Sequence, residues 1–179
     1  MAQLTVRPIL RGARGVVACG HPLAAGCARD MFVRGGGAVD AAIAAAAALS
    51  VVLPDACGLG GDAMALVREA DGELRAYNGS GGAPARLGGI IPPDGGGTVA
   101  VPGCVAAWQD LHRDHGRLDP AVLVPEGGYL LNNRLQGFSR ADAGPNAPRP
   151  GARPVHTLSP MIIEHGDRVF ALATPGGGS

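Results

Sequence analysis

The apolar positions of the chain are concentrated in one stretch, Ala41–Leu53, which is interrupted only by Ser50. Alanine has the highest helix propensity of all residues, so this stretch predicts a buried helix. Asp40 is expected to cap its N-terminus, because a short acidic side chain there accepts a hydrogen bond from an unpaired backbone N–H group. Pro54 is expected to end it. A membrane span needs about 20 apolar residues, so the pattern indicates a central packing helix instead.

Two further segments have apolar residues at helical spacing. One begins at His21-Pro22, with proline in its first turn, and ends at Gly35. The other covers Cys104–His115 and ends at Gly116. The expected apolar faces consist of Leu23, Ala24, Cys27, Ala28, Met31 and Phe32 in the first helix, and of Val105, Trp108, Leu111 and His112 in the second.

Short apolar or alternating runs bounded by turn residues predict strands. Two pairs of runs flank an Asp-Gly or Gly-Asp turn, which is a strong signal for a hairpin. The hairpins are Ala63–Val67 with Glu73–Tyr77 around Asp71-Gly72, and Ser159–His165 with Arg168–Thr174 around Gly166-Asp167. Single strands are expected at Gly15–Cys19, Thr98–Val101 and Gly128–Asn133.

The glycine-rich segment Cys57–Asp62 is open to two interpretations, a phosphate-binding loop or a tight structural turn. Phosphate loops follow a strand and open a helix. Here the order is reversed, from helix through glycines to strand, and no lysine follows. The context favours a tight turn.

The chain of 179 residues is long enough for one domain with a sizeable core. It carries 15 Lys and Arg against 15 Asp and Glu, so no net field attracts nucleic acid or an anionic membrane. An apolar fraction of 46% excludes a disordered chain, while 30 glycines and 15 prolines indicate many tight turns. The N-terminal residues contain no apolar signal-peptide core, so a cytoplasmic location is expected.

The spacing of cysteine and histidine gives no sign of a metal site. The four cysteines contain no C-x-x-C pair and are expected to be free, most of them as small buried hydrophobes. His112 and His115 stand three residues apart without a third ligand at metal-binding spacing, so we interpret them as packing or exposed residues.

Long motifs cover nearly the whole chain and carry a family resemblance. They are HPLAAGCARDMFVRGGGAVDAAIAAAAALSVVLPDACGLGGDAMALV, YNGSGGAPA and VAVPGCVAAWQDLHRDHGRL, followed by GYLLNNRLQGFS and by NAPRPGARPVHTLSPMII with its PGG ending. The first three resemble the large subunit, and the last two the small subunit, of the gamma-glutamyltranspeptidase family. The NGSG and His-Thr elements are similar to its gamma-glutamyltransferase-like branch.

This resemblance implies an α+β fold, part of the αββα sandwich of an N-terminal-nucleophile hydrolase. Residues 1–118 would be the large-subunit part and 122–179 the small-subunit part of one incomplete domain. In that family, self-cleavage exposes a threonine whose hydroxyl attacks a gamma-glutamyl amide, with its own amine as base. The acyl group then passes to water, an amino acid or a peptide, and no metal or organic cofactor is implied.

Four positions match the substrate-binding residues of the family. The resemblance places its oxyanion-stabilising Gly-Gly turn on Gly176 and Gly177, and its carboxylate-holding pair on His156 and Thr157. Taken without the resemblance, the first pair is an ordinary chain turn and the second merely begins a strand.

The chain also departs from the family pattern. Ser80 replaces the substrate-binding arginine, Gly82 stands where the related branch often has arginine, and Gly137 replaces the acidic residue that holds the substrate amine. Between Leu118 and Val122 the cleavage site and the threonine nucleophile are missing, so no catalytic residue is expected. The family's elements after the Gly-Gly turn are also expected to be missing.

Two hypotheses follow from these departures. In the first, which we favour, the chain is an internally deleted form of a gamma-glutamyltransferase or glutathione hydrolase-like enzyme and is inactive as given. In the second, it is a short non-catalytic paralogue that acts as a binding or structural module. An unrelated α/β binding domain is the third interpretation of the same pattern.

Overall fold

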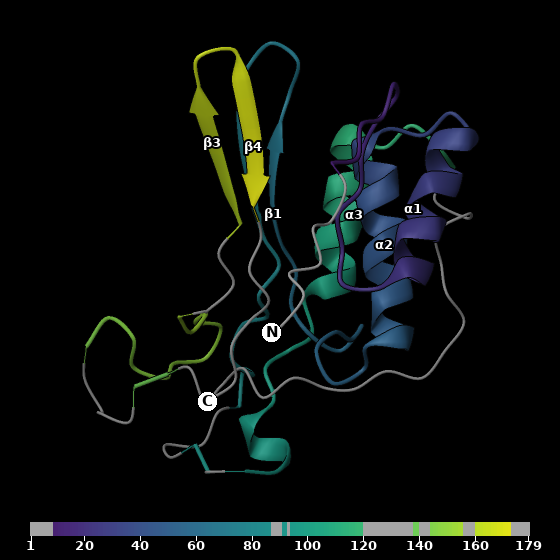
Figure 1. Ribbon diagram of the computed structural model, residues 1–179. Helices are drawn as coiled ribbons and strands as arrows, with labels where there is room; N and C mark the ends of the chain where they lie inside the picture. The colour runs from purple at the N-terminus through teal and green to yellow at the C-terminus, as the bar shows by residue number, and fades with distance from the viewer. Residues whose placement is uncertain are drawn as a thin grey trace, which may run out of the picture.

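In the part of the chain that the structure describes, a layer of three helices lies beside a layer of two β-hairpins (Figure 1). The computed structural model describes residues 9–86, 91–92, 94–119, 138–139, 144–155 and 160–172. Its elements are α1 (Pro22–Val33), α2 (Ala38–Val52), β1 (Met64–Arg68), β2 (Leu74–Asn78), the 3₁₀ turn η1 (Gly96–Thr98), α3 (Cys104–His115), β3 (Met161–His165) and β4 (Arg168–Leu172). Among the described residues, no helix combines the length and apolar character needed to cross a bilayer.

Helix α2 is the central packing helix, as predicted, and it ends at Val52 before Pro54. Its start differs from the prediction. Gly37 is the N-cap, and Asp40 lies inside the first turn, where its Oδ2 accepts a hydrogen bond from Gly37 N at 2.7 Å. The sequence predicts the cap too late because Ala38 and Val39, which belong to the helix, precede the apolar run that begins at Ala41.

Helices α1 and α2 pack through small side chains. The core between them consists of Ala24, Ala28, Met31, Ala41 and Ala45, all buried. Alanine lets the two helix backbones approach closely while still removing apolar surface from water. The termini of α1 agree with the prediction, since His21 is its N-cap and Gly35, with a φ of 90°, follows the C-cap.

The apolar faces predicted for α1 and α3 are partly wrong. Leu23 is 63% exposed, Cys27 is exposed and Val105 is 44% exposed. The buried stripes are Ala24, Ala28 and Met31 in α1, and Cys104, Ala107 and Leu111 in α3. The exposed residues Leu23, Cys27 and Val105 lie on a neighbouring stripe that has the same spacing. Periodicity identifies the helix but does not select between adjacent stripes.

Both predicted hairpins form. Strands β1 and β2 are antiparallel with Ala65 opposite Tyr77, and β3 and β4 are antiparallel with Ile163 opposite Phe170. In the Asp71-Gly72 turn, Gly72 has a positive φ of 94° and Asp71 does not, whereas a two-residue type I′ turn would need positive values at both residues. The hairpin therefore has a longer turn, closed by hydrogen bonds between residues 69 and 72–73.

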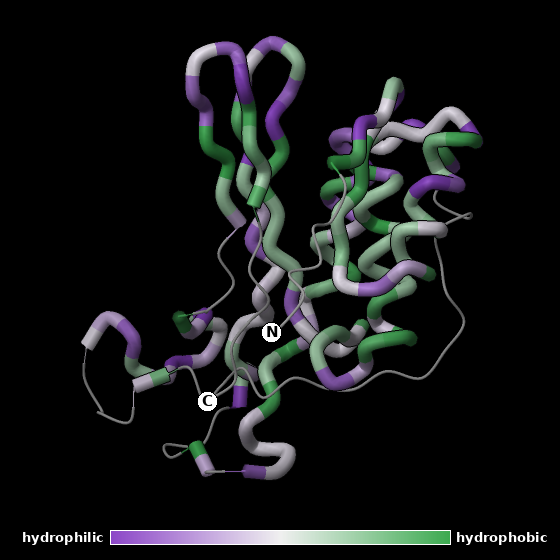
Figure 2. Tube along the Cα trace, in the orientation of Figure 1, coloured by the Kyte–Doolittle hydropathy of each residue, from purple (hydrophilic) through white to green (hydrophobic). Residues whose placement is uncertain are grey.

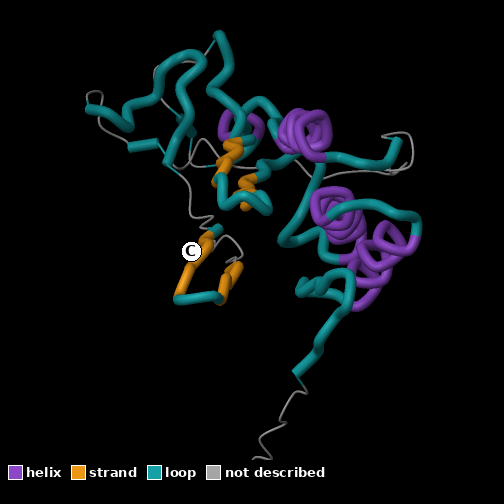
Figure 3. Tube along the Cα trace, turned by 90° about the horizontal axis from the view of Figure 1, so that it is seen from above, coloured by secondary structure: helices purple, strands orange, loops and turns teal. Residues whose placement is uncertain are grey.

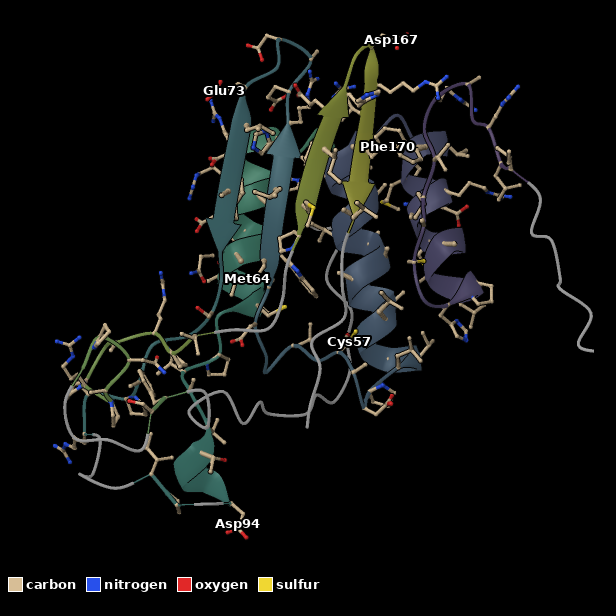
Figure 4. The ribbon with its side chains drawn as sticks, turned by 60° about the vertical axis from the view of Figure 1, so that its left-hand side comes forward. Cys57, Met64, Glu73, Asp94, Asp167 and Phe170 are labelled. Atoms are coloured by element: carbon tan, nitrogen blue, oxygen red, sulfur yellow. The ribbon has the colours of Figure 1, made fainter. Side chains whose placement is uncertain are left out.

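The two hairpins lie side by side in the order β2, β1, β3, β4, and in the view of Figure 4 they stand in front of the helices. Seen from above, the strands and the helices form separate groups (Figure 3). The Arg68 Nε donates to Glu164 Oε1 at 2.5 Å and joins β1 to β3. The first hairpin packs against α2 and α3 through Ala65, Val67 and Tyr77. The second hairpin contains hydrophobic residues, which are green in Figure 2. It is nevertheless largely exposed, and Phe170 is 47% exposed.

Two predicted strands do not form. Gly15–Cys19 is an irregular segment that runs along α1, and Gly15 lies against the Phe32 ring. In the segment Thr98–Val101, Thr98 is the last residue of η1 and the following residues are irregular. Neither segment has a partner strand within the described residues, and a strand requires one to satisfy its backbone groups. The strand predicted at Gly128–Asn133 lies outside the described residues.

Candidate functional site

A cleft of about 240 Å³ lies where the end of β2, the start of α3 and the segment 144–155 meet. This volume lies just below the range of about 300–1,000 Å³ that is usual for ligand pockets, which limits any ligand to a small one. The cleft is lined by Tyr77–Gly82, Val101–Gly103, Ala106, Ala107, Asp110 and Arg153.

The loop after β2 forms one wall of the cleft and is held by its own polar groups. The Asn78 side-chain oxygen accepts hydrogen bonds from Ser80 N at 3.0 Å and from Ser80 Oγ at 2.6 Å. Gly81 N donates to Asp62 Oδ1 at 3.3 Å. Ser80, the residue in the place of the family's arginine, is 1% exposed and turned toward Asn78. Because serine is uncharged, it does not replace the positive charge that the family's arginine brings to this position.

The glycine-rich segment 57–62 holds the start of α3 in place beside the cleft. Gly61 O accepts hydrogen bonds from Gly103 N at 3.1 Å and from Cys104 N at 3.0 Å, at the start of α3. Gly61 N donates back to Gly58 O at 3.1 Å. These bonds support the interpretation as a tight turn, because the segment uses its backbone groups to position α3.

The segment 144–155 closes the cleft through backbone contacts with the loop. Ala83 N donates to Ala152 O at 2.7 Å, and Gly151 N donates to Ala83 O at 2.9 Å. A Cβ atom on Gly82 would lie 2.9 Å from Gly151 O, so only glycine permits this approach. These contacts place Arg153 on the cleft.

Among the described residues that line the cleft, Arg153 and Asp110 are the charged ones. Asp110, on α3, forms an exposed ion pair in which Arg113 Nη1 donates to its Oδ1 at 2.6 Å. Arg153 has no ion-pair partner among the described residues. The site can therefore present both a positive and a negative group to a ligand.

Tyr77 connects the cleft to a polar network between β2 and α3. Its hydroxyl donates to Asp114 Oδ2 at 2.8 Å and lies 2.7 Å from His115 Nε2, while His115 Nδ1 forms an ion pair with Glu69. Burial raises the pKa of the Tyr77 hydroxyl, and the hydrogen bond to Asp114 raises it further. The phenol is thus kept protonated at neutral pH and suits a structural contact better than a nucleophile.

The two histidines singled out by the sequence have different partners. His112 Nε2 lies 2.7 Å from Leu118 O, whereas His115 contacts Tyr77 and Glu69. Within the described part of the chain, no group of three or more His, Cys, Asp or Glu residues is arranged to hold a metal ion. The structure supports the interpretation of both histidines as packing residues.

Of the cysteines, only Cys104 is buried, which corrects the expectation that most are. Burial, and secondarily the charge of Asp62, raise the pKa of the Cys104 thiol to about 12. Cys57 is half-buried, and Cys19 and Cys27 are exposed. The expectation of burial, which came from the sequence context of the cysteines, is therefore wrong for Cys19 and Cys27.

The substrate-binding residues expected from the resemblance cannot be placed against this cleft. His156, Thr157, Gly176 and Gly177 lie outside the described residues, as does Gly137. The sequence singled out neither Arg153 nor Asp110. Arg153 lies in an irregular proline-rich stretch and Asp110 on a polar helix face, so neither carries a local signal beyond its charge.

Comparison with known proteins identifies the class. The model of the gamma-glutamyltranspeptidase family matches residues 24–126 and 120–179. The "Glutathione hydrolase-like YwrD proenzyme" of Bacillus subtilis is 34% identical over 131 residues, which cover 68% of this chain and 25% of that protein. The chain belongs to the gamma-glutamyltranspeptidase family.

Solved structures agree with this assignment. The gamma-glutamyltranspeptidase of Helicobacter pylori is similar with a TM-score of 0.59 and 29% identity, over 65% of this chain and 37% of that chain. The cephalosporin acylase of Bacillus halodurans is similar with a TM-score of 0.57 and 37% identity, over 69% of this chain and 25% of that chain. The fold is α+β and represents part of the N-terminal-nucleophile hydrolase sandwich, as predicted.

Proposed function

We propose that this chain derives from a gamma-glutamyltransferase or glutathione hydrolase-like enzyme whose intact form transfers a gamma-glutamyl or related acyl group to water, an amino acid or a peptide. The pair of family matches carries this proposal, because residues 24–126 and 120–179 together account for most of the chain. The chain spans only about a quarter to a third of the length of the curated relatives it matches. The activity is therefore that of a longer protein.

We further propose that residues 1–118 and 122–179 are the large-subunit and small-subunit parts of one incomplete domain. The two matched segments meet at residues 120–126, which supports a join at this point. Contacts across the join support a single unit. Arg68 pairs with Glu164 between β1 and β3, and Ala83 exchanges backbone hydrogen bonds with residues 151 and 152.

As given, the chain is expected to lack turnover because it has no threonine in a self-cleavage context. Thr98, the threonine within the described residues, is 4% exposed, and its Oγ1 donates to Gly95 O at 2.8 Å. Thr5, Thr157 and Thr174 lie outside the described residues and stand in other sequence contexts. A buried, hydrogen-bonded hydroxyl such as that of Thr98 is not available as a nucleophile.

The test is an assay of the purified chain with a chromogenic gamma-glutamyl anilide, combined with a denaturing gel. We expect no release of the anilide above the buffer rate and a single band. Turnover, or two bands from one chain, would contradict the expected inactivity.

Sequencing the locus through Leu118–Val122 separates the two hypotheses. An intervening coding segment with a threonine supports the deleted enzyme, and an unbroken short reading frame supports the non-catalytic paralogue. The second hypothesis has one observation in its favour, since the cleft walls come from residues that the chain already contains. The expected ligand of the intact enzyme is a gamma-glutamyl or related acyl small molecule, and no nucleic acid, membrane or cofactor is expected to bind. The cytoplasmic location stays a prediction.

A further inference from the structure

We propose that the groove between the segment 10–17 and α1 binds a medium-chain fatty acid, a role that goes beyond the proposed acyl transfer and does not depend on it. The groove has a volume of about 300 Å³ and shares no lining residue with the cleft beside β2. This volume is at the lower end of the usual range for ligand pockets. The lining combines apolar side chains with two arginines, and among the described residues it includes no acidic side chain.

The floor of the groove is one face of α1. Ala25, Arg29 and Phe32 stand at positions i, i+4 and i+7, which places them on the same side of the helix. Phe32 and Val17 also pack against the buried core between α1 and α2. The floor is therefore held in place by the core and is present before any ligand binds.

Two glycines let the segment before α1 form the opposite wall. A Cβ atom on Gly15 would lie 2.7 Å from the Cζ atom of Phe32, so glycine allows the backbone to rest on this ring. A Cβ atom on Gly12 would lie 2.0 Å from Gly15 O, so only glycine permits the tight bend of residues 12–15. On either side of this bend, Leu10 and Val16 line the groove and are 75% and 59% exposed. An alkyl chain in the groove would remove part of this apolar surface from water.

The two arginines determine the charge of the ligand. Arg11 forms no ion pair among the described residues, and the ion pair of Arg29 with its neighbour Asp30 is exposed and 3.6 Å long. Such a pair contributes little, so both guanidinium groups can donate to a carboxylate. A cationic amphiphile would be repelled, and a neutral one would leave both groups unused. The groove therefore favours an anion with an apolar chain.

Isothermal titration calorimetry of the full chain with decanoate, kept below its critical micelle concentration, tests the assignment. We expect saturable binding that is about 5- to 15-fold weaker for octanoate, because two methylene groups fewer are buried. Decyltrimethylammonium has the same alkyl chain with a cationic head. It should bind more weakly than decanoate.

The double variant Arg11→Gln/Arg29→Gln should weaken decanoate binding about 3- to 30-fold. Arg14→Gln/Arg34→Gln is the matched control, since it removes the same charge from exposed positions of the same region that do not line the groove. Val16→Ser changes an exposed wall residue and should also weaken decanoate binding while both arginines remain. Circular dichroism checks that each variant is folded.

The assignment is overturned if the wild-type chain shows no saturable binding of decanoate, or if the groove variants bind decanoate as the control variant does. Vesicles of phosphatidylglycerol are the comparison probe. If they bind the chain and monomeric decanoate does not, the surface contacts membranes and the fatty-acid site is refuted. None of these measurements needs turnover, so the anilide assay and the locus sequence test the proposed function separately.

Discussion

Asp40, in the first turn of α2, binds the backbone of Arg117, which follows α3. Arg117 N lies 3.2 and 3.1 Å from the two carboxylate oxygens of Asp40. Leu118 N and Gly37 N also donate to this carboxylate, at 3.2 and 2.7 Å. The Asp40 side chain is fully buried. One carboxylate therefore fixes the start of α2 and the chain directly before the join of the two family segments.

Replacing Asp40 is expected to destabilise the fold strongly. Asp40→Ala leaves buried backbone N–H groups without an acceptor, and each such group costs about 1–3 kcal/mol. We expect a loss of about 3 kcal/mol or more in the free energy of unfolding, measured by urea denaturation. Asp40→Asn should lose less, because its amide oxygen can still accept. Asp94→Ala, at an exposed position, is the control and should stay within about 0.5 kcal/mol. Equal losses in Asp40→Ala and Asp94→Ala would refute the role of this carboxylate.

Asp40 also illustrates which parts of the fold were predictable from sequence. The alanine run and Pro54 predict α2 and its end, since both signals are local. The partners of Asp40 lie 77 and 78 residues away, and no local pattern identifies them. Thr98–Val101 fails as a strand for the same reason, because strand formation depends on a distant partner.

The candidate site was less predictable than the fold. The motifs led to the family, and the loop Tyr77–Gly82 does line the cleft. Arg153 is placed there by the approach of Gly151 to Gly82, a tertiary contact that neither residue signals in sequence. The family positions His156 and Thr157 lie outside the described residues and remain predictions.

The Tyr77 network predicts a loss of stability at alkaline pH. The pKa of Tyr77 is raised above 10.0 in the folded chain, first by burial and then by the hydrogen bond to Asp114. The unfolded chain therefore releases this proton at lower pH than the folded chain. The stabilisation is complete below about pH 10 and is lost as the pH rises through the folded pKa. We expect the free energy of unfolding of Tyr77→Phe, measured by urea denaturation, to fall less steeply than that of the wild type above pH 10. Identical slopes would exclude Tyr77 as the source.

The cysteines predict an order of chemical reactivity. The thiolate is the reactive form, and burial both raises the pKa of Cys104 to about 12 and blocks access to it. Cys57 is half-buried with a pKa raised by burial and by Asp55. Timed iodoacetamide labelling with peptide mass spectrometry should modify Cys19 and Cys27 first, Cys57 more slowly and Cys104 last.

The same labelling in concentrated urea is the control, and all four cysteines should then react at similar rates. Rapid modification of Cys104 under native conditions would show that the first residue of α3 is not buried as described.

Two glycines predict opposite effects of the same substitution. Gly26 lies inside α1, and a Cβ added there meets no atom within 4 Å. Because alanine favours the helix, Gly26→Ala should raise the free energy of unfolding by about 0.5–1 kcal/mol. A Cβ added to Gly81 would lie 1.3 Å from Val101 O, and this backbone atom cannot move without breaking the bond from Val101 N to Gly82 O. Gly81→Ala should therefore destabilise the chain and disrupt the cleft wall. Urea denaturation of both variants measures the two changes in the free energy of unfolding. If Gly81→Ala is as stable as the wild type, the loop does not approach Val101 as closely as described, and the cleft wall depends on that approach.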